Sequence, residues 1–173
     1  MIVSHDIKSV YVHAQKTGGS TCTLLLAEHA GVDVTEFGMG WQAAFHEHGM
    51  HGSIPRKKLT EFDDYLKWGF VRNPYDRWRS WWQAYGRGKT SGLTPLNITL
   101  RGVDRVGRFE TYEQDVRAIL GELGVHVPES LPHCNPPIRS LKLTAVDADW
   151  IWNRDRRDFE QFGYDQESWR EYA

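Results

Sequence analysis

A short segment near the start of the chain combines the residue types that bind a phosphate group. QKTGGSTCTLLL, residues 15–26, holds a lysine, two adjacent glycines and then two hydroxyl residues. Glycines let backbone N–H groups approach an anion, and the first turn of a following helix adds unpaired N–H groups and a positive dipole end. The segment therefore predicts an anion-binding loop to which Lys16 adds a full charge. The alternative, for this segment taken alone, is a glycine turn with a solvated lysine.

The order of residues separates this loop from the nucleotide-binding Walker A pattern. In GxxxxGK[ST] the lysine follows the glycines and opens the helix, whereas Lys16 precedes Gly18 and Gly19. The segment is an anion loop of a different kind.

A second segment, FVRNPYDRWRS at residues 70–80, carries an arginine where a strand is expected to end. Arginine is suited to a bidentate grip on a phosphate dianion, and Ser80 lies two helical turns beyond Arg72. Ligands of α/β proteins bind at the carboxyl ends of parallel strands. Two anion sites on one sheet edge would suit a nucleotide with phosphate groups at two separate positions.

Strand patterns alternate with helix patterns along the chain. We expect strands at 9–13, 68–72 and 106–109, and helices at 20–30, from Pro74, at 111–123 and from about Ala148, with Asn73 and Asp147 as N-caps. Trp78, Trp81 or Trp82, and Tyr85 recur at helical spacing, which favours core packing. The pattern predicts one α/β domain over residues 1–173, with a mainly parallel sheet flanked by helices.

Composition narrows the classes of function. The 173 residues carry 21 basic and 23 acidic side chains, so no overall positive field favours nucleic acid. Cys22 and Cys134 are far apart in sequence, which favours reduced thiols over a single disulfide. There is no apolar run of about 18 residues and no signal-peptide pattern, so we expect a cytoplasmic protein without membrane insertion.

KTGGST followed by FVRNPYDRWRS resembles the paired signature of sulfotransferases that use 3′-phosphoadenosine 5′-phosphosulfate (PAPS), in particular the carbohydrate-type, Golgi-like and bacterial branch. VGRFETYEQDVRAILGELG, LPHCNPPIRSL and DFEQFGY then occur in the order that similar segments take in that branch. The segment between Gly86 and Asp104 is shorter and more glycine-rich than usual in the family, and it is where the acceptor walls would be expected.

The resemblance implies a P-loop-like, nucleoside-kinase-like fold and a set of nucleotide contacts. The first motif would hold the 5′-phosphosulfate, and Arg72 with Ser80 the 3′-phosphate. Arg139, beside Ser140, is a further candidate from a late loop. The residues assigned to the first motif are Lys16, Thr17, Gly18, Gly19, Ser20 and Thr21.

The reaction implied is in-line transfer of a sulfuryl group to an acceptor hydroxyl, most plausibly on a saccharide. Adenosine 3′,5′-bisphosphate (PAP) would leave, and Lys16 would meet the charge that builds on the bridging oxygen. Positioning and charge stabilisation supply most of such catalysis. The donor carries no triphosphate and the sequence has no convincing carboxylate set, so no metal is expected. The oligomeric state stays open.

A histidine-rich segment between the two motifs, FHEHGMHGSIP, supplies candidates for the base that takes the acceptor proton. We rank His51 first and His48 second, with Glu47 and His46 behind them. The same cluster has two other interpretations, a zinc site that does not fit HExxH and exposed loop histidines without chemistry.

Two other functions remain open at this point. A P-loop-like kinase or other nucleotide-dependent transferase would need a metal-holding carboxylate and a lysine after the glycines. A degenerate nucleotide-binding module would not need Lys16 and the histidine cluster together. Among the other polar residues, Arg77 and Arg79 are interpreted as solvated or salt-bridged, and Glu110 as orienting a site residue or pairing with Arg108.

Overall fold

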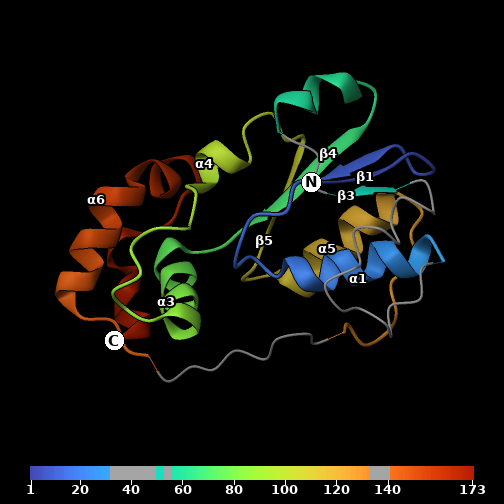
Figure 1. Cartoon of the computed structure of the whole chain (residues 1–173). Coiled ribbons are helices and arrows are strands. Elements are labelled where there is room, and N and C mark those ends of the chain that lie inside the picture. The colour runs from blue at the N-terminus through green and yellow to red at the C-terminus, as the bar shows by residue number, and fades with distance from the viewer. Residues whose placement is uncertain (32–49, 53–55, 133–140) are drawn as a thin grey trace.

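The computed structural model describes residues 1–31, 50–52, 56–132 and 141–173, in which helical elements lie against both faces of a five-stranded sheet and at one end of it (Figure 1). The order across the sheet is β3-β1-β2-β4-β5. The strands are β1 (Ile2–Ser4), β2 (Ser9–Tyr11), β3 (Met50–Gly52), β4 (Leu66–Val71) and β5 (Arg105–Arg108).

The sheet is mixed, so the expectation of a mainly parallel sheet is only partly right. β2 pairs with β4 and β4 with β5 in parallel, but β1 runs antiparallel to both β2 and β3. The difference arises at the start of the chain, where β1 and β2 form a hairpin because the connection between them is too short for a crossover. Lys8 enters β2 from this turn with a φ of 45°.

The helices follow the strands much as the sequence predicts. They are α1 (Gly19–His29), α3 (Pro74–Tyr85), α4 (Leu96–Thr99), α5 (Tyr112–Glu122) and α6 (Ala145–Phe162), with 3-10 turns η2 (Arg56–Phe62) and η3 (Gln166–Tyr172). Asn73 caps α3 as expected, because its side chain accepts a hydrogen bond from the Tyr75 N–H at 3.0 Å.

The start of α6 corrects one prediction. Asp147 is not the N-cap but the third residue of the helix, and Thr144 is the cap. The Thr144 hydroxyl accepts from the Asp147 N–H while the Asp147 carboxylate accepts from the Thr144 N–H, which is the reciprocal capping box.

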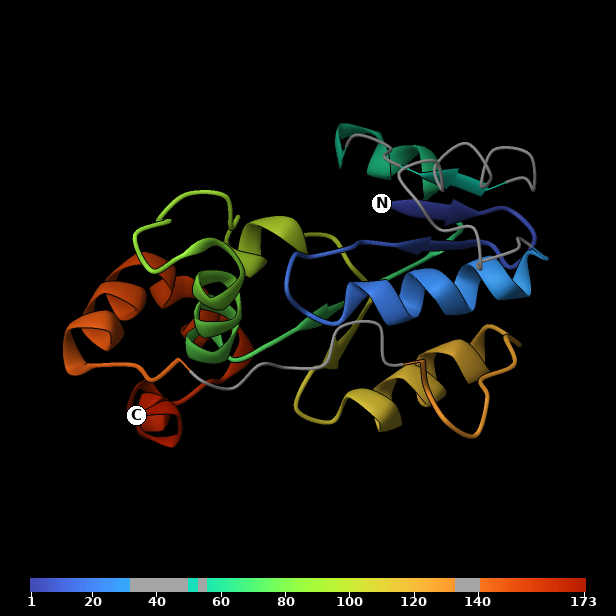
Figure 2. The ribbon, with the colours of Figure 1, turned by 60° about the horizontal axis from the view of Figure 1, so that its bottom comes forward.

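Successive residues of β2 point to opposite faces of the sheet and into different parts of the core. The helices α1 and α5 cover one face of the sheet (Figure 2). Tyr11 packs with Trp68 and Phe70 on that face, whereas Val10 and Val12 pack on the other. The carboxyl ends of β2 and β4 lie at the end of the sheet that is next to α3.

Tryptophans join α3 and α6 in a separate cluster beside the sheet. Trp78, Trp81 and Trp82 are buried there, as the helical spacing predicts, but Tyr85 is 60% exposed. The cluster fixes α3, and with it the second motif. Among the described helices, none is long and apolar enough to cross a membrane.

Candidate functional site

The two sequence motifs meet at one edge of the sheet. The first follows β2, the second follows β4, and the parallel register sets Tyr11 beside Trp68. The loop of residues 14–18, here called the cradle loop, leads into α1 at Gly19. The edge is the one at which α/β proteins bind their ligands.

Four carbonyl groups of the cradle loop are held by donors of the protein. Two of the donors are the arginines of the second motif. Ala14 O accepts from Thr17 Oγ1 at 2.9 Å, Gln15 O from Arg77 Nε at 2.9 Å, Lys16 O from Arg72 Nη1 at 3.0 Å and Gly18 O from the Tyr112 hydroxyl at 2.5 Å. The second motif therefore shapes the first.

This arrangement fixes the direction of the loop's N–H groups. All peptide bonds here are trans, so each N–H points away from the carbonyl of the preceding residue. With the carbonyls of Gln15, Lys16 and Gly18 turned into the protein, the N–H groups of the residues that follow them turn the opposite way. Within the part of the chain that the structure describes, these three N–H groups have no hydrogen-bond acceptor.

Left-handed backbone at two positions makes the loop concave. Lys16 has a φ of 65° and Gly18 a φ of 84°. A non-glycine residue in this region costs about 1 kcal/mol, which the bond from Arg72 to Lys16 O helps to offset. Alternation of this kind forms the nests of N–H groups that bind anions in proteins. The start of α1 adds its dipole to the same place.

The Lys16 ammonium lies partly buried beside this concavity. Partial burial, and then the positive charge of Arg72, lower its pKa. An anion placed between the two cations would remove that repulsion. The site is therefore electrostatically suited to a negative ligand.

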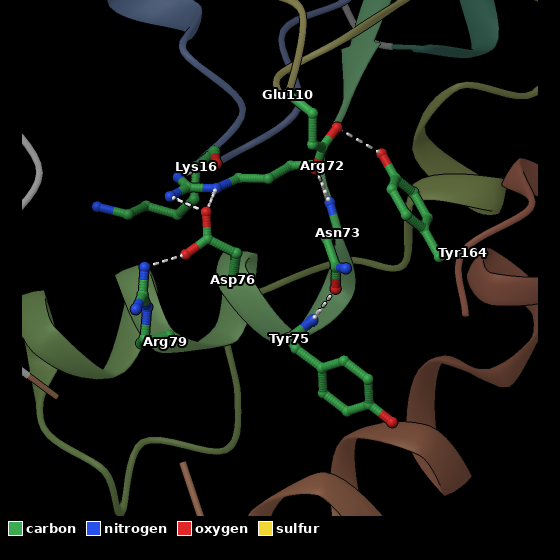
Figure 3. Close-up of polar contacts among 8 residues, drawn as sticks. All are labelled: Lys16, Arg72, Asn73, Tyr75, Asp76, Arg79, Glu110 and Tyr164. Atoms are coloured by element: carbon green, nitrogen blue, oxygen red, sulfur yellow. Dashed lines mark hydrogen bonds and ion pairs between the residues drawn. The ribbon is translucent and has the colours of Figure 1, made fainter. Parts of the chain in front are cut away.

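Arg72 is buried and already engaged (Figure 3). Its Nε and Nη2 contact Asp76 Oδ2 at 2.8 and 2.7 Å, its Nη1 donates to Lys16 O, and its guanidinium lies 4.0 Å from the centre of the Phe109 ring. A guanidinium has five N–H donors. The contacts with Asp76 and Lys16 O use three of these donors.

Arg77 corrects another prediction. It is neither solvated nor in a surface ion pair but buried, and it donates to Gln15 O and to Thr94 O. Burial lowers its pKa to about 10. Arg77 therefore holds the cradle loop in place through Gln15 O. Arg79 is salt-bridged as expected, and its partner is Asp76 at 2.5 Å.

Glu110 orients the second motif rather than pairing with Arg108. Its carboxylate accepts from the Asn73 N–H at 2.6 Å and from the Tyr164 hydroxyl at 3.1 Å (Figure 3). Arg108 instead donates to Phe162 O and lies over the Tyr164 ring. The turn between β4 and α3 is thus fixed from β5 and from the C-terminal segment.

Two hydroxyl groups assigned to the nucleotide are used inside the protein. Thr17 is buried with its hydroxyl on Ala14 O, and the Thr21 hydroxyl donates to Pro132 O at 2.9 Å. Ser20 is exposed at the start of α1. Ser80 lies half-buried on α3, one turn after Asp76 on the same face of the helix.

The predicted base candidates are only partly placed. His51 lies in β3, where its backbone is opposite Val3, so two strand spacings separate it from β2. His46, Glu47, His48, Arg139 and Cys134 lie outside the described residues, whereas Cys22 is a buried free thiol. No group of acidic, histidine or cysteine side chains suited to a metal ion occurs in the described ranges.

A pocket of about 630 Å³ has Asp76, the ion-pair partner of Arg72, in its lining. Both charge signs and two aromatic rings line it. The lining includes Asp76, Arg79, Phe109, Glu110, Lys142 and Tyr172. Its volume is in the range of small-molecule sites.

Sequence reasoning missed three residues of this site. Tyr112 binds Gly18 O from α5, and Asp76 joins Arg72 to Arg79. His13 packs against Gly19 at the start of α1. Asp76 and His13 are both within or next to the motifs, so a search for polar residues flanking the motifs would have found them. Tyr112 gives no such signal, because it is 94 residues from its partner.

Comparison of the chain with protein-family models, with curated proteins and with solved structures finds no match.

Proposed function

We propose that this protein is a PAPS-dependent sulfotransferase that transfers a sulfuryl group to an acceptor hydroxyl. The observation that carries the proposal is the joining of the two motifs in one site. Arg72 and Arg77 of the second motif hold consecutive carbonyls of the cradle loop, and the N–H groups of that loop are thereby turned outward. The resemblance of the motif pair to that of sulfotransferases indicates that the ligand of this anion site is PAPS.

The residues present fit a ligand with two anionic groups. The cradle loop, Lys16 and the start of α1 would hold the 5′-phosphosulfate. The remaining N–H groups of Arg72 would hold the 3′-phosphate together with Ser80, which lies on the same face of α3 as Asp76. The pocket lined by Asp76, next to Arg72, has room for the nucleoside beside these groups.

In this account each residue has a separate task. The donor would supply the activated sulfuryl group. The cradle N–H groups bind its phosphate, and Lys16 stabilises the negative charge that the bridging oxygen gains as its bond to sulfur breaks. Arg77, Tyr112 and Glu110 touch neither reactant but hold the loop and the second motif in position.

The acceptor remains proposed as a saccharide, on the resemblance alone, and its hydroxyl proton passes to a histidine base. His51 is the first candidate and His48 the second. A bond forms between the acceptor oxygen and sulfur, and the bond between sulfur and the bridging oxygen of the donor breaks. No metal is needed for this step, since the leaving group is stabilised by Lys16 and the cradle.

A transfer assay tests the proposal. Purified protein is incubated with sulfur-labelled PAPS and a panel of saccharides, and sulfated product and PAP are both measured. Lys16→Met keeps the side-chain length and should reduce kcat by at least about 100-fold, the cost typical of a lost transition-state contact. His51→Ala should abolish transfer and leave PAP affinity nearly unchanged.

Lys8→Met is the matched control. Lys8 is the other described lysine with a left-handed backbone, but it lies exposed in the β1–β2 turn, paired with Asp64. Its replacement should leave transfer unchanged. Metal-dependent transfer of phosphate from ATP, without sulfuryl transfer from PAPS, would favour the kinase alternative, and tight PAP binding without transfer to any acceptor would favour the non-catalytic module.

A further inference from the structure

His13 lies at the cradle loop, although neither motif includes it. It lies two residues after the end of β2, and its ring stacks on Tyr11 with centroids 5.9 Å apart and planes 16° apart. The ring also packs against the first residue of α1. A Cβ built on Gly19 would lie 2.0 Å from His13 Nε2. Gly19, whose φ is not left-handed, is therefore a glycine because the imidazole fills the place of its side chain.

This position gives the imidazole access to a ligand in the cradle. The ring nitrogen is next to the residue whose N–H is turned outward by the bond between Tyr112 and Gly18 O. The His13 side chain keeps an exposed surface although one side of its ring packs against neighbouring residues, and neither of its ring nitrogens is hydrogen-bonded to any residue that the structure describes. A buried or paired histidine would not be available in this way.

The surroundings keep the free imidazole neutral. Packing of the ring against Tyr11 and Gly19 removes water from it and lowers its pKa, and the α-ammonium of Met1 adds a smaller repulsion. Lys16, three residues further along the chain in the cradle loop, is another positively charged side chain of the site. The phenol of Tyr11 is neutral, since burial raises its pKa well above the ordinary value. No described carboxylate is among the groups that shift His13.

We propose that His13 is part of the anion site and that it takes up a proton when a phosphorylated nucleotide binds in the cradle loop. A dianion at the N–H groups of the loop reverses the local sign of charge and favours the imidazolium. The protonated ring then donates an N–H to a phosphate oxygen, which is the stronger, charge-assisted kind of hydrogen bond. Binding therefore strengthens as the pH falls toward the range in which His13 titrates. This inference rests on the proposed function, because it uses the same ligand.

Calorimetry of PAP binding tests the inference. Titrations from pH 5.5 to 8.5, each in two buffers of different ionisation enthalpy, give the number of protons taken up. Wild type should take up a fraction of a proton near pH 7, and His13→Gln should lose that part. Affinity of His13→Gln should be about 5- to 10-fold weaker at pH 6 and should approach that of wild type at pH 8.5. The 3′- and 5′-phosphates of PAP titrate near pH 6 themselves, so the difference between the two proteins is the informative quantity.

His29→Gln is the matched control. His29 is the last residue of α1, at the end far from the cradle loop, and it pairs with Asp6. It should bind PAP with the pH dependence of wild type. Should His13→Gln fail to fold, the histidine ring protons of wild type are titrated by NMR with and without saturating PAP, and one histidine pKa should rise.

Three outcomes have distinct meanings. Equal proton uptake by wild type and His13→Gln, or no histidine pKa that rises on binding, would overturn the role of His13. If wild type nevertheless binds PAP, only the role of His13 is wrong, and the proposed function is not contradicted. Failure of wild type to bind PAP at any pH would contradict the proposed function itself, and with it this inference.

Discussion

At the residue scale, Arg72 connects the two halves of the site. It donates to the carbonyl of Lys16, forms an ion pair with Asp76 and stacks on Phe109. The sequence assigns it only a phosphate, whereas the structure gives it a second task, which is to hold the left-handed backbone at Lys16. A change at Arg72 should therefore affect both the fold of the loop and the binding of ligand.

Arg72→Lys tests this double role. Lysine keeps the charge but cannot replace the planar fork, so Asp76 and Lys16 O cannot both be satisfied. We expect a loss of stability of about 1–3 kcal/mol, the cost typical of buried donors and acceptors left unpaired. PAP affinity should fall at least about 10-fold. Thermal unfolding and calorimetry measure the two effects.

The matched control for Arg72→Lys is Arg105→Lys, an exposed arginine on β5 that pairs with Glu122. Surface ion pairs contribute little, so it should change neither quantity. If Arg72→Lys weakened PAP binding without any change in stability, Arg72 would be a ligand contact only.

At the element scale, the cradle depends on the junction between β2 and α1, where two glycines have different reasons to be glycine. Gly18 has a φ of 84°, and a Cβ there would lie 2.7 Å from Tyr112 Cε2. At Gly19 the three atoms nearest to an added Cβ all belong to the His13 ring. The first is a backbone constraint, and the second is a packing constraint from a side chain that can rotate.

Alanine substitutions should separate the two glycines. Gly18→Ala should lower stability by about 1–2 kcal/mol for its left-handed backbone and should weaken PAP binding as the loop shifts. Gly19→Ala should cost less stability, because the exposed His13 ring can move, but it should remove the His13-dependent proton uptake. Denaturant unfolding measures the first effect and calorimetry the second.

Gly121→Ala in α5 is the matched control, since nothing lies within 4 Å of its added Cβ. It should raise stability by at most about 0.5–1 kcal/mol, the value for a helix interior, because Gly121 lies in the last turn of α5, and it should leave binding unchanged. Equal stability losses for Gly18→Ala and Gly121→Ala would contradict the structure of the cradle.

Sequence patterns predicted these local elements well and their long-range partners poorly. The strand before each motif, the Asn73 cap and the helix after each motif follow from periodicity and capping chemistry, which act over a few residues. The bonds from Arg77 to Gln15 O and from Tyr112 to Gly18 O join residues 62 and 94 positions apart. Nothing local marks such partners, because any surface arginine or tyrosine has the same side chain.

The mixed sheet and the start of α6 have similar explanations. The β1 strand is three residues long, too short to show a period, and its antiparallel pairing is decided by the hairpin turn. At α6 the sequence analysis expected Asp147 as the cap, and the reciprocal bonds instead identify Thr144, another residue type that caps helices.

At the scale of the whole molecule, α6 holds the domain together through a buried carboxylate. Asp158 is fully buried and accepts from the N–H groups of Leu96 and Asn97 at 2.6 and 2.7 Å. It thereby ties α6 to α4 and to the loop whose Thr94 carbonyl binds Arg77. Burial raises the pKa of Asp158 to about 6, despite the two hydrogen bonds that favour the charged form.

The raised pKa predicts a specific dependence of stability on pH. The folded protein binds the Asp158 proton more tightly than the unfolded chain, so its contribution to stability is fully present below pH 4 and is lost as the pH rises through about 6. The full loss is at most on the order of 3 kcal/mol. Asp158→Asn should remove this pH dependence, measured by denaturant unfolding at pH 4.5 and pH 7.

Asp149→Asn, at an exposed position of the same helix, is the control and should keep the pH dependence of wild type. Identical slopes for wild type and Asp158→Asn would contradict the burial of this carboxylate.

The central claim concerns the whole site, namely that two anion-binding elements on one sheet edge hold a nucleotide with phosphates at both the 3′ and 5′ positions. Calorimetry with PAP, AMP and ATP, each with and without Mg²⁺, tests it most directly. We predict that PAP binds at least about 10-fold more tightly than AMP, the value of one charge-assisted contact, and that Mg²⁺ has no effect. Mg²⁺-dependent binding of ATP, with no preference for the 3′-phosphate, would contradict the account.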